Sequence, residues 1–127
     1  MAKKQEMELT ELYGDLYEIL GTDHVDDVKH LMVEVHMLHE AKEAIYDKSF
    51  ARRGIVGIWM NVARKYDSID TLGRLNSYFT VTMVDALIDV AVYALKMVEA
   101  IRKLRPEVFN EWYEKVYKNY VTETVDE

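Results

Sequence analysis

The chain has 127 residues, a length that fits one domain with a hydrophobic core of its own. Half of the residues are hydrophobic and 31% are charged, which is a globular rather than a disordered composition. The formal net charge is −7, whereas duplex DNA or RNA needs a basic surface, so we expect no nucleic-acid partner. The absence of cysteine excludes disulfides, thiolate metal sites and a cysteine nucleophile.

No segment of the sequence indicates a membrane protein or a secreted one. No apolar stretch follows Lys3 and Lys4 at the N-terminus, as it would in a secretory signal. The most apolar segment is too short to span a membrane, because Asp85, Asp89 and Lys96 interrupt it. We therefore expect a cytoplasmic protein without a membrane partner.

The first two helices are predicted over about residues 7–20 and 24–47, where apolar residues recur at helical spacing. Gly21 is a natural C-terminal stop for the first helix, and Thr22 or Asp23 can cap the second. The inward stripe of the second helix becomes polar over its last two turns, where it continues through His39, Lys42, Glu43 and Tyr46. A binding site could begin at this change of polarity.

A connection is predicted over residues 49–54, and a third helix follows over about 55–69. Gly73 and the Asn76-Ser77 pair are expected to break the helical pattern. Asn61, Arg64 and Lys65 follow one flank of this helix, where they could bind a ligand or form a solvated surface.

The fourth helix is predicted over about residues 79–104, and Pro106 suits the first turn of a fifth helix. The inward residues of the fifth helix are expected to be Val108, Phe109, Trp112, Val116 and Tyr117. Residues 121–127 are expected to fray. Short connections and the absence of predicted strands indicate an all-α fold, a compact bundle of about five helices in a single domain with its core at residues 7–120.

The fourth helix has apolar residues on every side, so other helices should surround it. The remaining helices of so short a chain are too few for this. We therefore expect a homo-oligomer, a dimer or a tetramer, with aromatic residues available for the interface. These are Trp59, Phe109, Trp112 and Tyr113.

Asp85 and Asp89 lie four residues apart on the fourth helix and therefore share one of its faces. Ionised carboxylates in an apolar setting are unfavourable unless they are paired or bind a metal, and oxygen ligands of this kind suit Mg²⁺ or Mn²⁺. Glu40 and Glu43 form an E-x-x-E step on the second helix. If this step faced the aspartates, the four acids would form a magnesium site for a di- or triphosphate.

The basic residues near these acids allow two interpretations. Arg64 and Lys65 could neutralise the phosphates of a ligand, or together with Lys42 they could be structural counter-ions of the aspartates. Tyr93 extends the face of the two aspartates by one further turn. The four histidines form no H-E-x-x-H motif and are interpreted as surface or boundary residues, and no Gly-rich phosphate loop or nucleophile elbow is present.

Three segments resemble the nucleotide modification associated domain 1 family, which is common in phages. Residues 42–50 resemble its K-x-x-x-Y-x-x-S-[WF] stretch, residues 57–69 its next helix, and residues 84–95 its D-x-x-x-D-x-x-x-Y helix. Together they cover about residues 36–98. The chain departs from the family where Asn61 aligns with a usual arginine.

Further departures are a missing basic residue near Ser68 and a missing glutamate at Val81. The acid-rich helical layout is also similar to that of all-α NTP pyrophosphatases of the MazG and dimeric dUTPase type, which carry E-x-x-E on one helix and E-x-x-D on a later one. Glu40-x-x-Glu43 fits the first motif. The second is matched only with altered spacing, by Asp85-x-x-x-Asp89.

These resemblances imply a nucleotide-handling protein of phage or host nucleotide metabolism, with a Mg-dependent nucleoside triphosphate pyrophosphohydrolase as the enzymatic hypothesis. Its Mg²⁺ would be held by Glu43, Asp85 and Asp89, with Glu40 as a further ligand, and would activate water to release pyrophosphate. The substrate-binding set would be Lys42, Tyr46, Asn61, Arg64, Lys65 and Tyr93. The alternatives are a phage protein that sequesters a nucleotide without catalysis, and a purely structural or interaction bundle.

Overall fold

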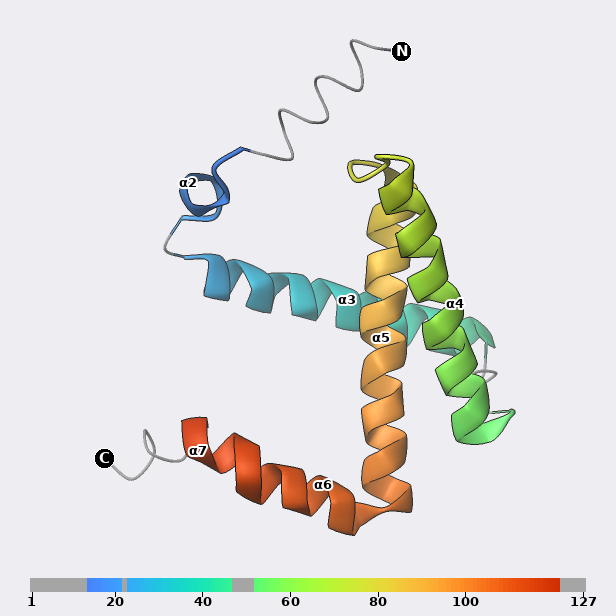
Figure 1. Cartoon of the computed structure of the whole chain (residues 1–127). Helices are drawn as coiled ribbons and strands as arrows, with labels where there is room; N and C mark the ends of the chain where they lie inside the picture. The colour runs from blue at the N-terminus through green and yellow to red at the C-terminus, as the bar shows by residue number, and fades with distance from the viewer. Residues whose placement is uncertain (1–13, 22, 47–51, 122–127) are drawn as a thin grey trace.

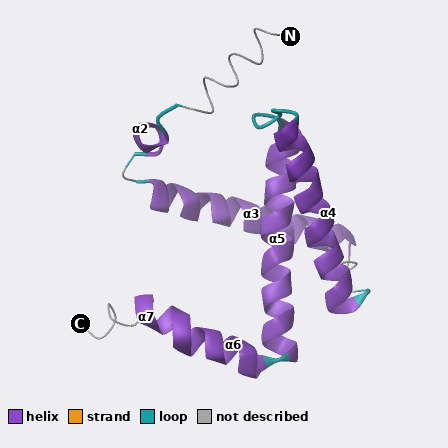
Figure 2. Cartoon of the chain, in the orientation of Figure 1, coloured by secondary structure: helices purple, strands orange, loops and turns teal. Residues whose placement is uncertain are grey.

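The computed structural model describes residues 14–21, 23–46 and 52–121, and every regular element within these ranges is a helix (Figure 1; Figure 2). The predicted all-α bundle is thereby confirmed. None of the described helices combines the length and the apolar character that a membrane span requires.

The N-terminal part of the described chain contains α2 (Leu16–Leu20) and α3 (His24–Tyr46). Gly21 ends α2 in the left-handed region, with φ of 66°, as expected for a glycine stop. Residues 7–13 of the predicted first helix lie outside the described residues. The predicted second helix is confirmed, and two acidic residues in its first turn complement the positive end of the helix dipole.

The third predicted helix is longer than expected, because α4 (Gly54–Arg74) continues through Gly73. Gly73 stays helical, and the ring of Tyr78 lies against it. The break comes at Asn76, whose φ of 55° lies in the left-handed region that asparagine tolerates better than most residues. The prediction of a break at Gly73 was therefore wrong by one turn, while the break at Asn76 is confirmed.

The fourth predicted helix is α5 (Val81–Leu104). Thr80 caps it, since its hydroxyl oxygen accepts a hydrogen bond of 3.1 Å from the backbone N–H of Met83. The most extensive packing in the described structure joins α4 to α5, which lie side by side in Figure 1. The buried hydrophobic side chains of the described residues belong to these two helices, Ile58 to α4 and Met83 and Ala86 to α5.

The C-terminal arm consists of α6 (Pro106–Trp112), the π-helical turn η2 (Tyr113–Tyr117) and α7 (Lys118–Val121). Pro106 occupies the first turn of α6, as predicted. Figure 1 shows the arm turning away from the end of α5, so that much of the arm has no described neighbour. Of the residues expected to face inward, Phe109 is half-buried, whereas Val108, Trp112 and Val116 are exposed.

The helix α3 crosses α5 with only its C-terminal part, and its N-terminal half projects beyond α4 and α5 (Figure 1). Large apolar side chains on this projecting half are accordingly exposed, among them Val25, Val28 and Met32. In the part of the chain that the structure describes, α5 contacts α3, α4 and α6 but is not surrounded by them. The hydrophobic core formed by the described residues is therefore small.

Candidate functional site

A pocket of about 330 Å³ lies where α3 crosses α4 and α5. The α3 residues of the pocket include His39, Lys42 and Glu43, which form the polar end of the inward stripe of this helix. They face one side of α5. The residues that line the pocket are Val35, Leu38, His39, Lys42 and Glu43 from α3, Arg64 and Lys65 from α4, and Ile88, Asp89, Val92, Tyr93 and Lys96 from α5.

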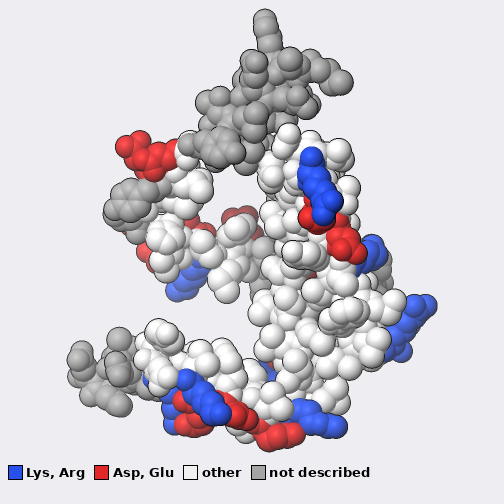
Figure 3. Space-filling view, viewed as in Figure 1, with Lys and Arg blue, Asp and Glu red and all other residues white. Residues whose placement is uncertain are grey.

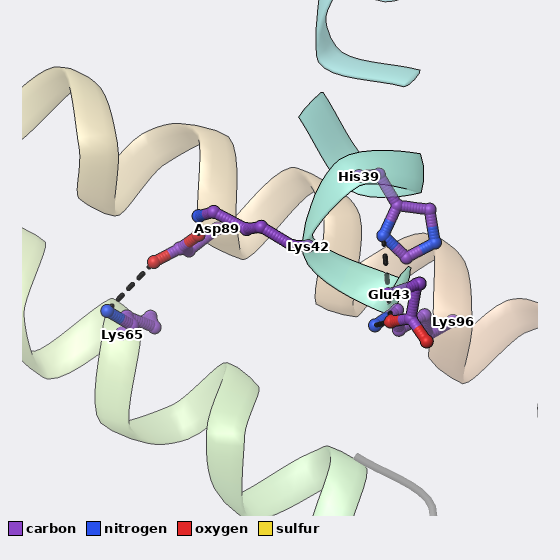
Figure 4. A network of polar contacts seen from close by, with 6 residues as sticks. All are labelled: His39, Lys42, Glu43, Lys65, Asp89 and Lys96. Carbon is purple, nitrogen blue, oxygen red and sulfur yellow. Dashed lines mark hydrogen bonds and ion pairs between the residues drawn. The ribbon is translucent and has the colours of Figure 1, made fainter. Parts of the chain in front are cut away.

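Asp89 is the central carboxylate of this pocket and joins three helices (Figure 4). One of its oxygens, Oδ2, lies 2.8 Å from Nζ of Lys65, and the other, Oδ1, lies 3.6 Å from Nζ of Lys42. The Asp89 side chain is 17% exposed and that of Lys65 is 22% exposed, so the closer pair is partly shielded from water. Water solvates a partly buried carboxylate less well than an exposed one, so the stability of its charged form depends on its ion-pair partners.

A second ion pair lies on the same side of α5, between Glu43 and Lys96 (Figure 4). Oε1 of Glu43 accepts a hydrogen bond of 2.6 Å from Nζ of Lys96 and lies 3.8 Å from Nδ1 of His39. The Lys96 ammonium also lies 5.3 Å from the centre of the Tyr93 ring, a cation–π distance. Sequence reasoning missed Lys96, although its position seven residues after Asp89 places the two on one helix face.

Arg64 differs from the three lysines in the kind of partner it has. Its guanidinium donates a hydrogen bond of 3.3 Å to Oδ1 of Asn61, which is a neutral amide. Among the described residues, no carboxylate forms an ion pair with Arg64. Its positive charge therefore remains available to an anionic ligand in the pocket.

The pocket carries more positive than negative charge. Three lysines and one arginine line it, together with two carboxylates, Glu43 and Asp89. The whole chain has a net charge of −7, so this excess of two positive charges is a local exception. Convergent cations in a concave site attract small anions even when the protein as a whole is acidic.

The structure separates the predicted site residues into two groups. Six of them line one pocket: Lys42, Glu43, Arg64, Lys65, Asp89 and Tyr93. Asn61 does not line it but accepts a hydrogen bond from Arg64, which does. Asp85 is exposed and does not line this pocket. Glu40 is exposed and pairs at 2.7 Å with Nε2 of His36. Tyr46 ends α3, and its side chain lies outside the described part of the structure.

The described residues fit an ion-pair network better than the expected magnesium site. Within the described ranges, no group of three or more acidic or histidine side chains lies close enough to hold a metal ion. Asp89 and Glu43 each contact a lysine ammonium, so a cation bound by them would compete with Lys65 and Lys96 for their negative charge. The four-acid magnesium site stays a prediction.

Comparisons with known proteins found no match. No protein-family model, curated protein or solved structure matches the chain. The resemblance to nucleotide-modification proteins and to all-α pyrophosphatases therefore stays a prediction, and the geometry of the pocket is the basis for assigning a function.

Proposed function

We propose that the chain binds a nucleotide through its phosphate groups, in the pocket between α3, α4 and α5, without catalysing its hydrolysis. The observation that carries the proposal is the excess of cations over carboxylates around the pocket. A phosphorylated ligand is the common small anion that needs several cationic groups at once. The choice of a nucleotide rests on the resemblance of residues 42–50 and 84–95 to nucleotide-modification proteins.

Arg64 and Lys42 are the groups that would contact the phosphates. The planar guanidinium of Arg64 can donate two parallel hydrogen bonds to phosphate oxygens, and its present partner is only an amide. Lys42 is the more distant of the two lysines at Asp89 and is 42% exposed. It can turn toward a ligand because Lys65 stays at 2.8 Å from the Asp89 carboxylate.

The rest of the pocket suits the uncharged part of such a ligand. Val35, Leu38, Ile88 and Val92 give the pocket apolar surface, and the half-buried Tyr93 lines it as well. Ligand pockets of about 300–1,000 Å³ are typical for small molecules, and a pocket of about 330 Å³ is at the lower end of that range. We therefore propose a single nucleotide as the ligand, with its base or sugar beside Tyr93.

Binding without hydrolysis is favoured because the carboxylates that a metal-dependent hydrolase would need are engaged by lysines. Asp89 contacts Lys65, and Glu43 contacts Lys96, so each negative charge serves to hold helices together. In this proposal, Mg²⁺ is not required for binding. The requirement for Mg²⁺ therefore separates the proposed binding protein from the pyrophosphohydrolase hypothesis.

The test is calorimetric titration of the chain with nucleoside mono-, di- and triphosphates in the presence of EDTA. We expect binding that survives chelation and weakens at least about tenfold in Arg64→Gln, because a charge-assisted hydrogen bond is lost. Arg74→Gln is the matched control, since Arg74 lies on the same helix, pairs with Asp70 and is outside this pocket. Binding that requires Mg²⁺ together with release of pyrophosphate, or no binding of any nucleotide, would overturn the proposal.

A further inference from the structure

One face of α5 is apolar and largely exposed. Val84, Leu87, Leu95 and Val98 are between 46% and 65% exposed, and Ala91, midway between them, is exposed as well. At about 100° per residue, all five lie within a sector of about 80°. Figure 1 shows α3 passing behind α5 and α4 running beside it, and in Figure 3 the open front of α5 is mostly uncharged.

This face reads the same in both directions along the helix. The order is Val, Leu, Ala, Leu, Val, and the spacings from Val84 to Val98 are three, four, four and three residues. A two-fold interface needs a surface that is complementary to itself, in which each residue i of one copy meets residue j of the other and the reverse. A palindromic stripe centred on a small residue meets this condition for two antiparallel helices.

We infer that two copies of the chain associate through this face, with their α5 helices antiparallel and crossing at Ala91. Each Val84 then meets Val98 of the other copy, and each Leu87 meets Leu95. The alanine at the centre lets the two helix backbones approach closely, while the valines and leucines pack on either side of it.

Charge also favours a second copy as the occupant. No charged residue lies on this stripe between Val84 and Val98. The first charge in line with it is Arg102, which the antiparallel arrangement places opposite Thr80 rather than opposite another charge. Two chains of net charge −7 thus meet through an uncharged surface.

The association compensates for the small core of the single chain. Ile58, Met83 and Ala86 are the only hydrophobic side chains that are buried among the described residues. Pairing along α5 would cover its exposed side, and Asp89 and Lys96 lie on the other side of the helix. Each copy thereby keeps its own open pocket, and the inference does not depend on what the pocket binds.

Single cysteines test this arrangement cleanly because the natural chain contains none. Helices whose axes are about 8–10 Å apart bring facing Cα atoms to about 4–5 Å at the crossing point, which a disulfide can span. We expect oxidised Ala91→Cys to form a covalent dimer. Thr82→Cys, which is exposed on the side of α5 away from the stripe, is the control and should remain unlinked.

The direction of the helices is tested by the two ends of the stripe. Antiparallel packing predicts that Val84→Cys and Val98→Cys remain unlinked alone, whereas the double variant with both cysteines forms linked dimers. Self-linking of Val84→Cys alone would overturn the antiparallel arrangement. Ala91→Cys that links no faster than Thr82→Cys would overturn the interface.

The mass in solution supplies a second measurement that needs no cysteine. The natural chain is expected at twice its mass of 14.9 kDa, and Leu95→Glu at 14.9 kDa with its helical circular dichroism retained. Val33→Glu, which changes an exposed apolar residue of α3 outside this face, should stay dimeric. A natural chain that is monomeric, or a Leu95→Glu variant that stays dimeric, would overturn the inference.

Discussion

Replacing Lys65 by methionine removes the closest partner of the Asp89 carboxylate while keeping most of the apolar length of the side chain. The carboxylate, which is 17% exposed in the natural chain, would keep Lys42 at 3.6 Å as its remaining described ion-pair partner. Lys42 is itself 42% exposed, so water screens this second interaction.

The expected loss lies between two reference cases. Breaking a fully buried ion pair costs about 3–5 kcal/mol, and breaking an exposed one costs about 0–1 kcal/mol. Because Asp89 and Lys65 are partly buried and Lys42 stays, we expect Lys65→Met to lower the free energy of unfolding by about 1–2 kcal/mol. The exposed pair between Arg74 and Asp70 provides the control, and Arg74→Met should cost less than about 0.5 kcal/mol.

The assay is urea denaturation followed by circular dichroism, with all variants at one protein concentration because association shifts apparent stability. The double variant Lys65→Met/Asp89→Leu should recover most of the loss, since no unpaired carboxylate remains. A Lys65→Met variant as stable as the natural chain would mean that Asp89 is solvated well enough to need no partner.

Three further predictions concern single residues. Lys42→Ala should weaken nucleotide binding in calorimetry but change stability by less than about 0.5 kcal/mol, because Lys65 still holds the carboxylate. Glu43→Gln should lower the free energy of unfolding by about 1 kcal/mol, because the ion pair between Glu43 and Lys96 is lost. It should also tighten phosphate binding, because it raises the positive excess of the pocket, and weaker binding would contradict this. Thr80→Ala should cost about 1 kcal/mol in urea denaturation and Thr80→Ser little, since serine keeps the capping hydroxyl; equal losses would exclude the cap.

The elements of the fold could be predicted from local signals. Periodic apolar residues located the helices, and Pro106 marked the start of α6 correctly. The polar end of the second helix's stripe also located the pocket, because His39, Lys42 and Glu43 are its wall. These signals depend only on residues close together in the sequence, so they can be recognised without knowing how the helices pack.

The ion-pair partners of the acidic residues could not be predicted from local signals. Asp85 and Asp89 share a face of α5, and nothing in the sequence distinguishes which of them forms ion pairs. They differ because α3 crosses α5 beside Asp89, one turn beyond Asp85, so that only Asp89 meets lysines from two other helices. The crossing point is set by tertiary packing, and it also brings Lys96 to Glu43 across 53 residues of sequence.

The extent of α4 shows a second limit of local signals. A glycine inside a helix is unfavourable by about 1 kcal/mol relative to alanine, which made Gly73 look like an end. Gly73 nevertheless stays in the helix, where the Tyr78 ring packs against it, and the chain turns only at Asn76. A local preference of this size is readily overridden by the contacts of a neighbouring segment.

If the pocket binds phosphate groups through its excess cations, the guanidinium of Arg64 is the group that reports the binding most directly. We would follow the Arg side-chain Nε–H resonances by NMR while titrating a nucleoside triphosphate in EDTA. We expect the Arg64 resonance to shift and saturate, whereas that of Arg74, on the same helix but outside the pocket, should stay in place. An Arg64 resonance that does not move, or that moves only in step with Arg74, would contradict this expectation.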